Sequence, residues 1–175
     1  MNKISNKYTI QIAELKDSED FEFEEELKII RDKGDLELIP ELIELIKDEQ
    51  VSTDRKHKIV ELLSDITNSN VREMLIDAID SLKGTPYLSL LISAMWQSRL
   101  DFTPWLDQIV QLMFEADLYT TIEVITLIEN SSENLNDSQK HHIRNILQDQ
   151  IIECKDETRK FLILESLNSF ILSND

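Results

Sequence analysis

The sequence predicts an all-α protein. From Leu27 onward its apolar residues recur at three- and four-residue intervals almost without interruption, which is the spacing of one face of a helix. Only two glycines and three prolines occur in 175 residues, so glycine-rich phosphate loops and tight hairpin turns are nearly excluded. About nine helices of roughly 12 to 16 residues, joined by short loops, account for the chain and leave no room for a sheet.

The first half of the chain predicts four helices. An acidic helix is expected from about Phe21 to Lys33, and a second from about Asp35 to Asp48 with charged and apolar residues on opposite faces. A third opens at Thr53 or Asp54 as the N-cap and closes in the polar stretch 67–70. A fourth opens at residue 70 and ends at Gly84.

The second half predicts five more helices. Pro86 and Pro104 suit the first turns of two of them, because proline lacks the N–H that a helix leaves unpaired there. The expected buried stripes of the last three are Ile122, Ile125 and Ile128; Ile143, Ile146, Leu147 and Ile151; and Phe161, Leu164, Leu167 and Ile171.

Residues 1–18 are ambiguous, because Tyr8, Ile10 and Ile12 alternate as in a strand but no partner strand is in sight. We treat residues 1–18 as an N-terminal tail and residues 19–175 as a single domain. We expect the acidic residues 14–26 to cap the domain, since repeat arrays need a polar outer face at their ends.

Helix pairs recur with a period of about 34 residues. The expected starts lie near Asp35, Asn70, Thr103 and Asp137, and two helices fit in each interval. Such a period favours a solenoid of stacked helix hairpins over a closed bundle.

One hairpin resembles a HEAT repeat, over about residues 35–83. In that family a first helix with an early proline ends at an aspartate, and a valine and a basic residue open the second helix. The matching positions are Pro40, Leu42, Asp48, Val51 and Arg55. The resemblance implies an all-α, armadillo-like α-solenoid of about four HEAT-like hairpins plus an N-terminal helix, a curved scaffold that binds other proteins, usually along its concave face.

The net charge of −17 limits the choice of partners. Nucleic acids and anionic membrane surfaces attract basic proteins, so neither is expected to bind here. A basic protein is the natural electrostatic complement. Cys154 is the only cysteine, and neither a signal-like apolar stretch at the N-terminus nor a run of about 18 apolar residues occurs. We expect a cytoplasmic protein.

The residues do not assemble a recognisable catalytic pattern, so no catalytic residue, metal or cofactor is expected. The histidine–glutamate pairs of a HEAT-like iron hydroxylase are missing at His57, His141 and His142, and the acidity reverses the sign of a DNA glycosylase groove. Cys154 continues the Leu147–Ile151 stripe and is expected to be a small buried hydrophobe. The alternatives are a HEAT-like enzyme or cofactor-handling lyase-like protein, and a structural subunit that associates with itself.

The candidate partner-binding residues are Tyr87, Trp96, Arg99 and Trp105. Six of the eleven aromatic residues fall between positions 87 and 119, and Arg99 is the one basic residue among eight acids in residues 84–139. Arginine beside tryptophan and tyrosine is enriched at the energetic centre of protein interfaces. The competing interpretation is that the aromatic residues pack in the core and that Arg99 pairs with Asp101 or Asp107.

Overall fold

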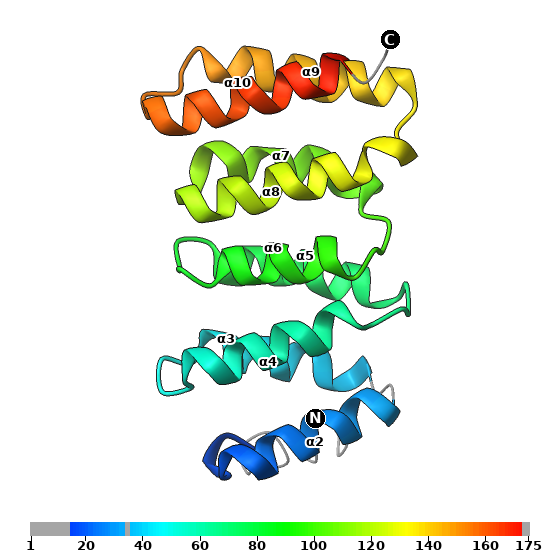
Figure 1. Ribbon diagram of the computed structural model, residues 1–175, viewed down its shortest axis with the longest axis vertical. Helices are drawn as coiled ribbons and strands as arrows, with labels where there is room; N and C mark the ends of the chain where they lie inside the picture. The colour runs from blue at the N-terminus through cyan, green and yellow to red at the C-terminus, as the bar shows by residue number, and fades with distance from the viewer. Residues whose placement is uncertain (1–14, 34–35, 173–175) are drawn as a thin grey trace, which may run out of the picture. The chain divides into compact units, whose positions relative to one another are not determined.

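The computed structural model describes residues 15–33 and 36–172, and these residues form helices and no strand (Figure 1). The all-α prediction is confirmed. The predicted tail up to residue 14 lies outside the described residues. The α-helices are α2 (Asp20–Lys33), α3 (Ile39–Lys47), α4 (Thr53–Ser64), α5 (Val71–Leu82), α6 (Leu88–Gln97), α7 (Leu106–Glu115), α8 (Leu118–Ser131), α9 (Asp137–Ile151) and α10 (Glu157–Leu172). Three short 3₁₀ helices are η1 (Leu36–Leu38), η2 (Thr103–Trp105) and η3 (Ser132–Asn134).

The helix boundaries follow local capping chemistry. The N-cap of α4 is Ser52, whose hydroxyl accepts the backbone N–H of Arg55 at 3.3 Å, and not Thr53 or Asp54 as predicted. Pro104 lies in η2 ahead of α7, and Pro86 precedes the N-cap of α6, Tyr87. Gly84 follows α5 with a φ of 76°, in the left-handed region that favours glycine.

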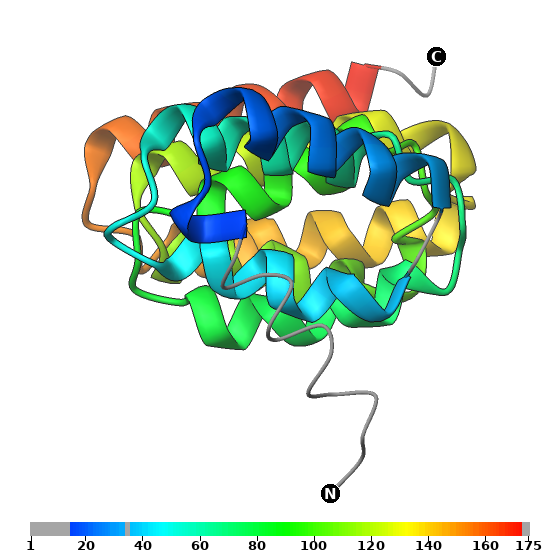
Figure 2. The ribbon, with the colours of Figure 1, turned by 90° about the horizontal axis from the view of Figure 1, so that it is seen from below.

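The chain divides into two compact units, one ending at Leu100 and one beginning at Asp101. In the first unit α3 packs against α5 and α4 against α6, while α2 packs on α4 (Figure 2). In the second unit α7 packs against α9 and α8 against α10. Consecutive helices also pair as α3–α4, α5–α6, α7–α8 and α9–α10. Each unit is therefore built from helix pairs in which first helix contacts first helix and second contacts second.

The core of the second unit differs from two of the predicted buried stripes. On α8 the buried residues include Thr121, Val124 and Leu127 as well as Ile128, and Ile122 is exposed. On α10 the buried residues are Ile163, Ser166 and Leu167, whereas Phe161 and Leu164 are exposed, and nothing is described of the side chain of Ile171. Ile128 and Leu167 are buried as predicted, but both helices carry apolar residues on more than one face, so spacing alone also assigned exposed residues to the core.

Cys154 is also not where the stripe predicted it. Helix α9 ends at Ile151, so Cys154 lies in the turn before α10 and is half-buried. Its thiol lies 3.6 Å from the carbonyl oxygen of Asp156. The expected continuation of the apolar face fails because the helix stops three residues earlier.

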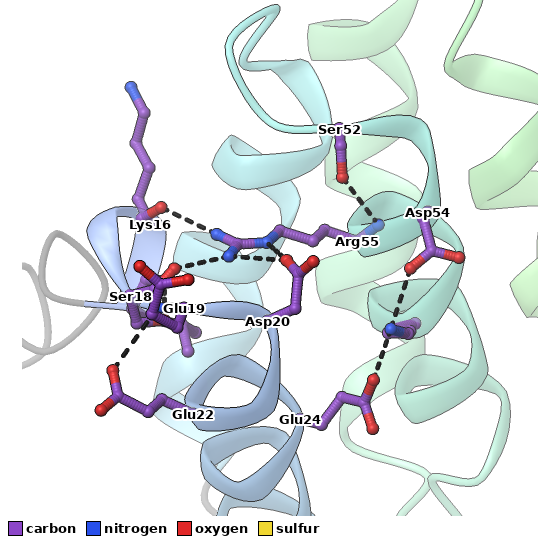
Figure 3. A network of polar contacts seen from close by, with 11 residues as sticks. Lys16, Ser18, Glu19, Asp20, Glu22, Glu24, Ser52, Asp54 and Arg55 are labelled. Carbon is purple, nitrogen blue, oxygen red and sulfur yellow. Dashed lines mark hydrogen bonds and ion pairs between the residues drawn. The ribbon is translucent and has the colours of Figure 1, made fainter.

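Hydrogen bonds from the Arg55 side chain connect α4 to the segment that precedes α2 (Figure 3). Its Nη1 donates to the carbonyl oxygen of Lys16 at 2.9 Å and its Nη2 to that of Ser18 at 2.5 Å. Its Nε donates to Asp20 at 2.9 Å, and its guanidinium carbon lies 4.7 Å from the centre of the buried Phe23 ring. One side chain thus satisfies two part-buried carbonyls and stacks on the core.

Arg159 repeats this arrangement in the second unit. Its backbone N–H is capped by Asp156 at 3.0 Å, as that of Arg55 is by Ser52. Its Nη1 donates to the carbonyl oxygen of Phe114 at 3.0 Å and its Nη2 to that of Ala116 at 2.5 Å, again two carbonyls spaced two residues apart. Leu118 occupies the position of Asp20, so the Nε of Arg159 has no hydrogen-bond partner among the described residues. The two arginines are separated by about three 34-residue periods.

Candidate protein-binding surface

The four predicted partner-binding residues lie in three places. Tyr87 precedes the first residue of α6, Trp96 lies in the last turn of α6, and Arg99 follows two residues after the helix. Because a helix rises 1.5 Å per residue, Tyr87 and Trp96 are roughly 14 Å apart along the axis. Trp105 ends η2 in the second unit. The first unit thus brings Trp96 and Arg99 near one end of α6 and places Tyr87 at the other.

Burial distinguishes these residues further. Both tryptophans and Tyr87 are half-buried, and Arg99 is exposed with a φ of 57°, in the left-handed region. Trp105 tilts at 58° against the buried Phe102, with ring centres 6.5 Å apart. Asp107, one predicted partner of Arg99, instead lies 3.0 Å from Nε2 of the exposed His142. The role of the four residues in binding stays a prediction.

Tyr87 has a partner that the sequence did not suggest. The ammonium nitrogen of Lys56 lies 3.5 Å from the centre of the Tyr87 ring, and Lys56 is only 2% exposed. A cation over an aromatic face, screened from water, is a favourable contact that helps to offset the cost of burying the charge. Tyr87 therefore helps to hold α4 against the start of α6 in the core of the first unit.

The largest apolar side chains that α8 and α10 expose form what we call the α8–α10 patch. Tyr119 is 75% exposed, Phe161 is 60% exposed, and Ile122 and Leu164 are each 42% exposed. On each helix the two residues are three positions apart and so share one face. Helices α8 and α10 pack against each other in the second unit (Figure 1).

The arginine contact sets the register of these two helices. Arg159 binds the carbonyl of Ala116, just before α8, from the first turn of α10, so the two helices start side by side. Ile122 is the fifth residue of α8 and Phe161 the fifth of α10, which places them at corresponding heights. The patch is thus two short apolar rows on adjacent helices.

The sequence holds a signal for this patch. Residues 161–164 are four consecutive apolar residues on one helix. Successive residues turn by about 100°, so four in a row cover most of the circumference and cannot all face the core. The wide apolar surface of α10, more than its spacing, marks a helix with a second contact face.

Acidic residues outnumber basic ones on and next to the two helices of the patch. Residues 115–131 contain four acidic residues and no basic one. Glu115 and Asp117 precede α8, and Glu157 and Glu165 lie four residues on either side of Phe161, all four exposed. The basic residues in and just before α10 are the exposed Lys155, the half-buried Lys160, and Arg159, which is bound to backbone carbonyls. The apolar rows therefore lie in a region of negative electrostatic potential.

In the first unit, α2 and α4 correspond to α8 and α10 of the second unit. Ion pairs join α2 to α4. Lys58 bridges Glu24 at 2.6 Å and Asp54 at 2.8 Å (Figure 3). Its hydrogen bond to Asp54, joined by that to Glu24, raises the pKa of Lys58, and the same bond lowers the pKa of Asp54. Lys16 lowers the pKa of Asp48 by a 2.6 Å ion pair. Residues 20–26 of the predicted acidic cap thus lie on α2, which packs on α4 and is joined to it by ion pairs.

The ion pairs of Lys58 predict a pH-dependent difference between the wild type and Lys58→Met. A carboxyl with a lowered pKa stabilises the fold above its ordinary pKa, 3.8 for Asp54, and the contribution is lost as the pH falls through the lowered value. The raised pKa keeps Lys58 charged at every pH below its ordinary value of 10.5, so in acid the pair is lost only when the Asp54 carboxyl takes up a proton. Urea unfolding should show a lower midpoint for Lys58→Met at pH 7, and the two midpoints should converge as the pH falls below 3.8. A difference that stays constant down to pH 2 would contradict the assignment.

The described residues hold no group of three or more histidine, cysteine, aspartate or glutamate side chains that could bind a metal ion. Within the same ranges, no helix has the length and apolar character needed to cross a membrane. No protein-family model, curated protein or solved structure matches the chain. The HEAT resemblance therefore rests on the residues quoted for it and stays a prediction.

Proposed function

We propose that the chain is an α-solenoid of HEAT-like hairpins that acts in the cytoplasm as a non-catalytic protein-binding module. Two observations support the repeat architecture. Within each unit the first helices of successive pairs pack together, and so do the second helices. Arg55 and Arg159 also make the same pair of backbone contacts about three periods apart.

The α8–α10 patch is the observation that carries the binding function. Single exposed apolar residues are ordinary on protein surfaces, whereas the largest contiguous apolar patch of a protein, a few hundred Å², is often functional. Four large apolar side chains gather here on two adjacent helices, with carboxylates next to them. A basic or amphipathic partner fits such a surface, because aromatic residues anchor an interface and charge complementarity steers encounter.

Affinity capture with matched variants tests the proposal. The wild type, the double variant Ile122→Ser with Phe161→Ser, and the control Phe21→Ser would each be used as bait in extracts of cells that make the protein. Phe21 is 74% exposed but lies on α2 in the first unit. A protein retained by the wild type and the control and lost with the double variant is the expected result, with weaker retention at higher salt. If all three baits retain the same proteins, the α8–α10 patch is not the binding surface.

A further inference from the structure

The two rows of the α8–α10 patch lie along adjacent helices, so a helix of another protein could lie between them and contact both. Tyr119 and Ile122 form one row, Phe161 and Leu164 the other, and packed helix axes lie about 8 to 10 Å apart. A helix with its side chains is about 10 Å in diameter. A single helix lying between the rows would therefore touch both rows with residues spaced three, four and seven apart.

We propose that the occupant of the α8–α10 patch is one amphipathic α-helix of another protein, with leucine-like anchors on one face and lysine or arginine residues along its flanks. This partner rests on the proposed protein-binding function and gives it a chemical form. The apolar face covers the two rows, and the basic flanks meet the carboxylates next to them.

The size of the patch favours a helix over a second copy of this chain. Two largely exposed aromatic and two partly exposed aliphatic side chains present roughly 400 Å² of apolar surface. A stable protein interface buries about 800 Å² on each partner, so the patch alone is too small for a lasting dimer. One face of a short helix matches the smaller area.

The charges next to the patch also favour a basic helix over a second copy of this chain. Two copies joined through this patch would bring Glu115, Asp117, Glu157 and Glu165 of one copy toward the same carboxylates of the other. Like charges opposed across an interface destabilise it, while lysine and arginine in those places would be attracted. The net charge of −17 adds a general repulsion between copies and a general attraction for a basic helix.

Synthetic peptides provide a direct test on the full-length protein. The first probe is an 18-residue leucine–lysine peptide whose leucines follow helical spacing; the second has the same composition in a scrambled order; the third replaces every lysine with glutamate. Fluorescence anisotropy of the labelled peptides gives affinities at low and moderate salt. Chemical-shift changes in ¹⁵N-labelled protein locate the contact.

We expect the helical leucine–lysine peptide to bind at α8 and α10 and to bind more weakly as salt rises. Its affinity should fall at least tenfold in the Ile122→Ser, Phe161→Ser variant and less than twofold in Phe21→Ser. The scrambled and glutamate peptides should bind at least tenfold more weakly than the helical leucine–lysine peptide.

Several results would overturn the proposal. Equal affinity for the scrambled peptide would indicate attraction between net charges only, and equal affinity for the glutamate peptide would remove the role of the carboxylates. A dimer that forms with rising concentration and disappears in the double variant would identify a second copy as the occupant. If the helical peptide fails to bind while capture still depends on the patch, the protein-binding function stands and its helical partner does not.

Discussion

Replacing Arg55 by leucine is expected to lower the free energy of unfolding of the first unit by about 2 to 4 kcal/mol. Leucine keeps part of the apolar stem that lies near Phe23 but removes the guanidinium that donates to the carbonyls of Lys16 and Ser18. Both bonds are part-buried, so the carbonyls lose charge-assisted partners without full access to water. The ion pair with the exposed Asp20 contributes little to the loss.

Arg31 supplies the matched control for this prediction. Its guanidinium pairs with Asp65 at 3.1 Å, with both side chains well exposed, so Arg31→Leu should cost less than about 1 kcal/mol. Urea unfolding gives the two free energies, and amide hydrogen exchange should show faster exchange in α2 for Arg55→Leu. Similar losses for both variants would mean that the backbone contacts of Arg55 add nothing beyond a surface ion pair.

Helix positions were predictable because they depend on local signals. Helix α5 begins at Val71, where its apolar spacing begins. It ends at Leu82, two residues before Gly84, which takes a left-handed conformation that a helix does not allow. The N-cap of α4 was missed by one residue, since serine, threonine and aspartate stand in a row at positions 52–54 and all can cap. Periodicity thus predicted the elements, and side-chain competition decided their ends.

The candidate surface was less predictable, because it depends on which face each helix turns inward. Tyr87 and Trp96 are neighbours in an aromatic-rich stretch of sequence, but a helix holds them at opposite ends. Large apolar residues lie on the exposed faces of α8 and α10 as well as in the core, so hydrophobic spacing alone did not separate the two faces. The packing of α8 against α7, of α10 against α9, and of α8 against α10 shows which residues stay outside.

The arginine contacts have a partial signal in the sequence. Ser52 and Asp156 each stand three residues before an arginine, which is the spacing of an N-cap and a side chain in the first helical turn. The repeat of that pair about three periods apart marks equivalent positions in the two units. The carbonyls that each arginine binds lie more than 30 residues away in sequence, so the contacts themselves needed the fold.

Two phenylalanines of the second unit should respond very differently to truncation. Phe102 is 1% exposed and packs against Trp105, whereas Phe161 lies on the exposed face of α10. Phe102→Ala removes a buried ring and leaves a cavity, and the expected loss in the free energy of unfolding is about 3 to 5 kcal/mol. Phe161→Ala should cost less than about 1 kcal/mol, because its ring already contacts water.

Urea unfolding followed by tryptophan fluorescence measures both variants, and Trp105 reports directly on the Phe102 site. The comparison also tests the basis of the proposed binding surface, since the sequence alone placed Phe161 in the buried stripe of α10. If Phe161→Ala lowers the free energy of unfolding by 3 kcal/mol or more, the Phe161 ring is buried in the core. The α8–α10 patch is then not a free surface. A small loss, together with the loss of partner binding in the double variant, would separate the role of Phe161 in recognition from any role in stability.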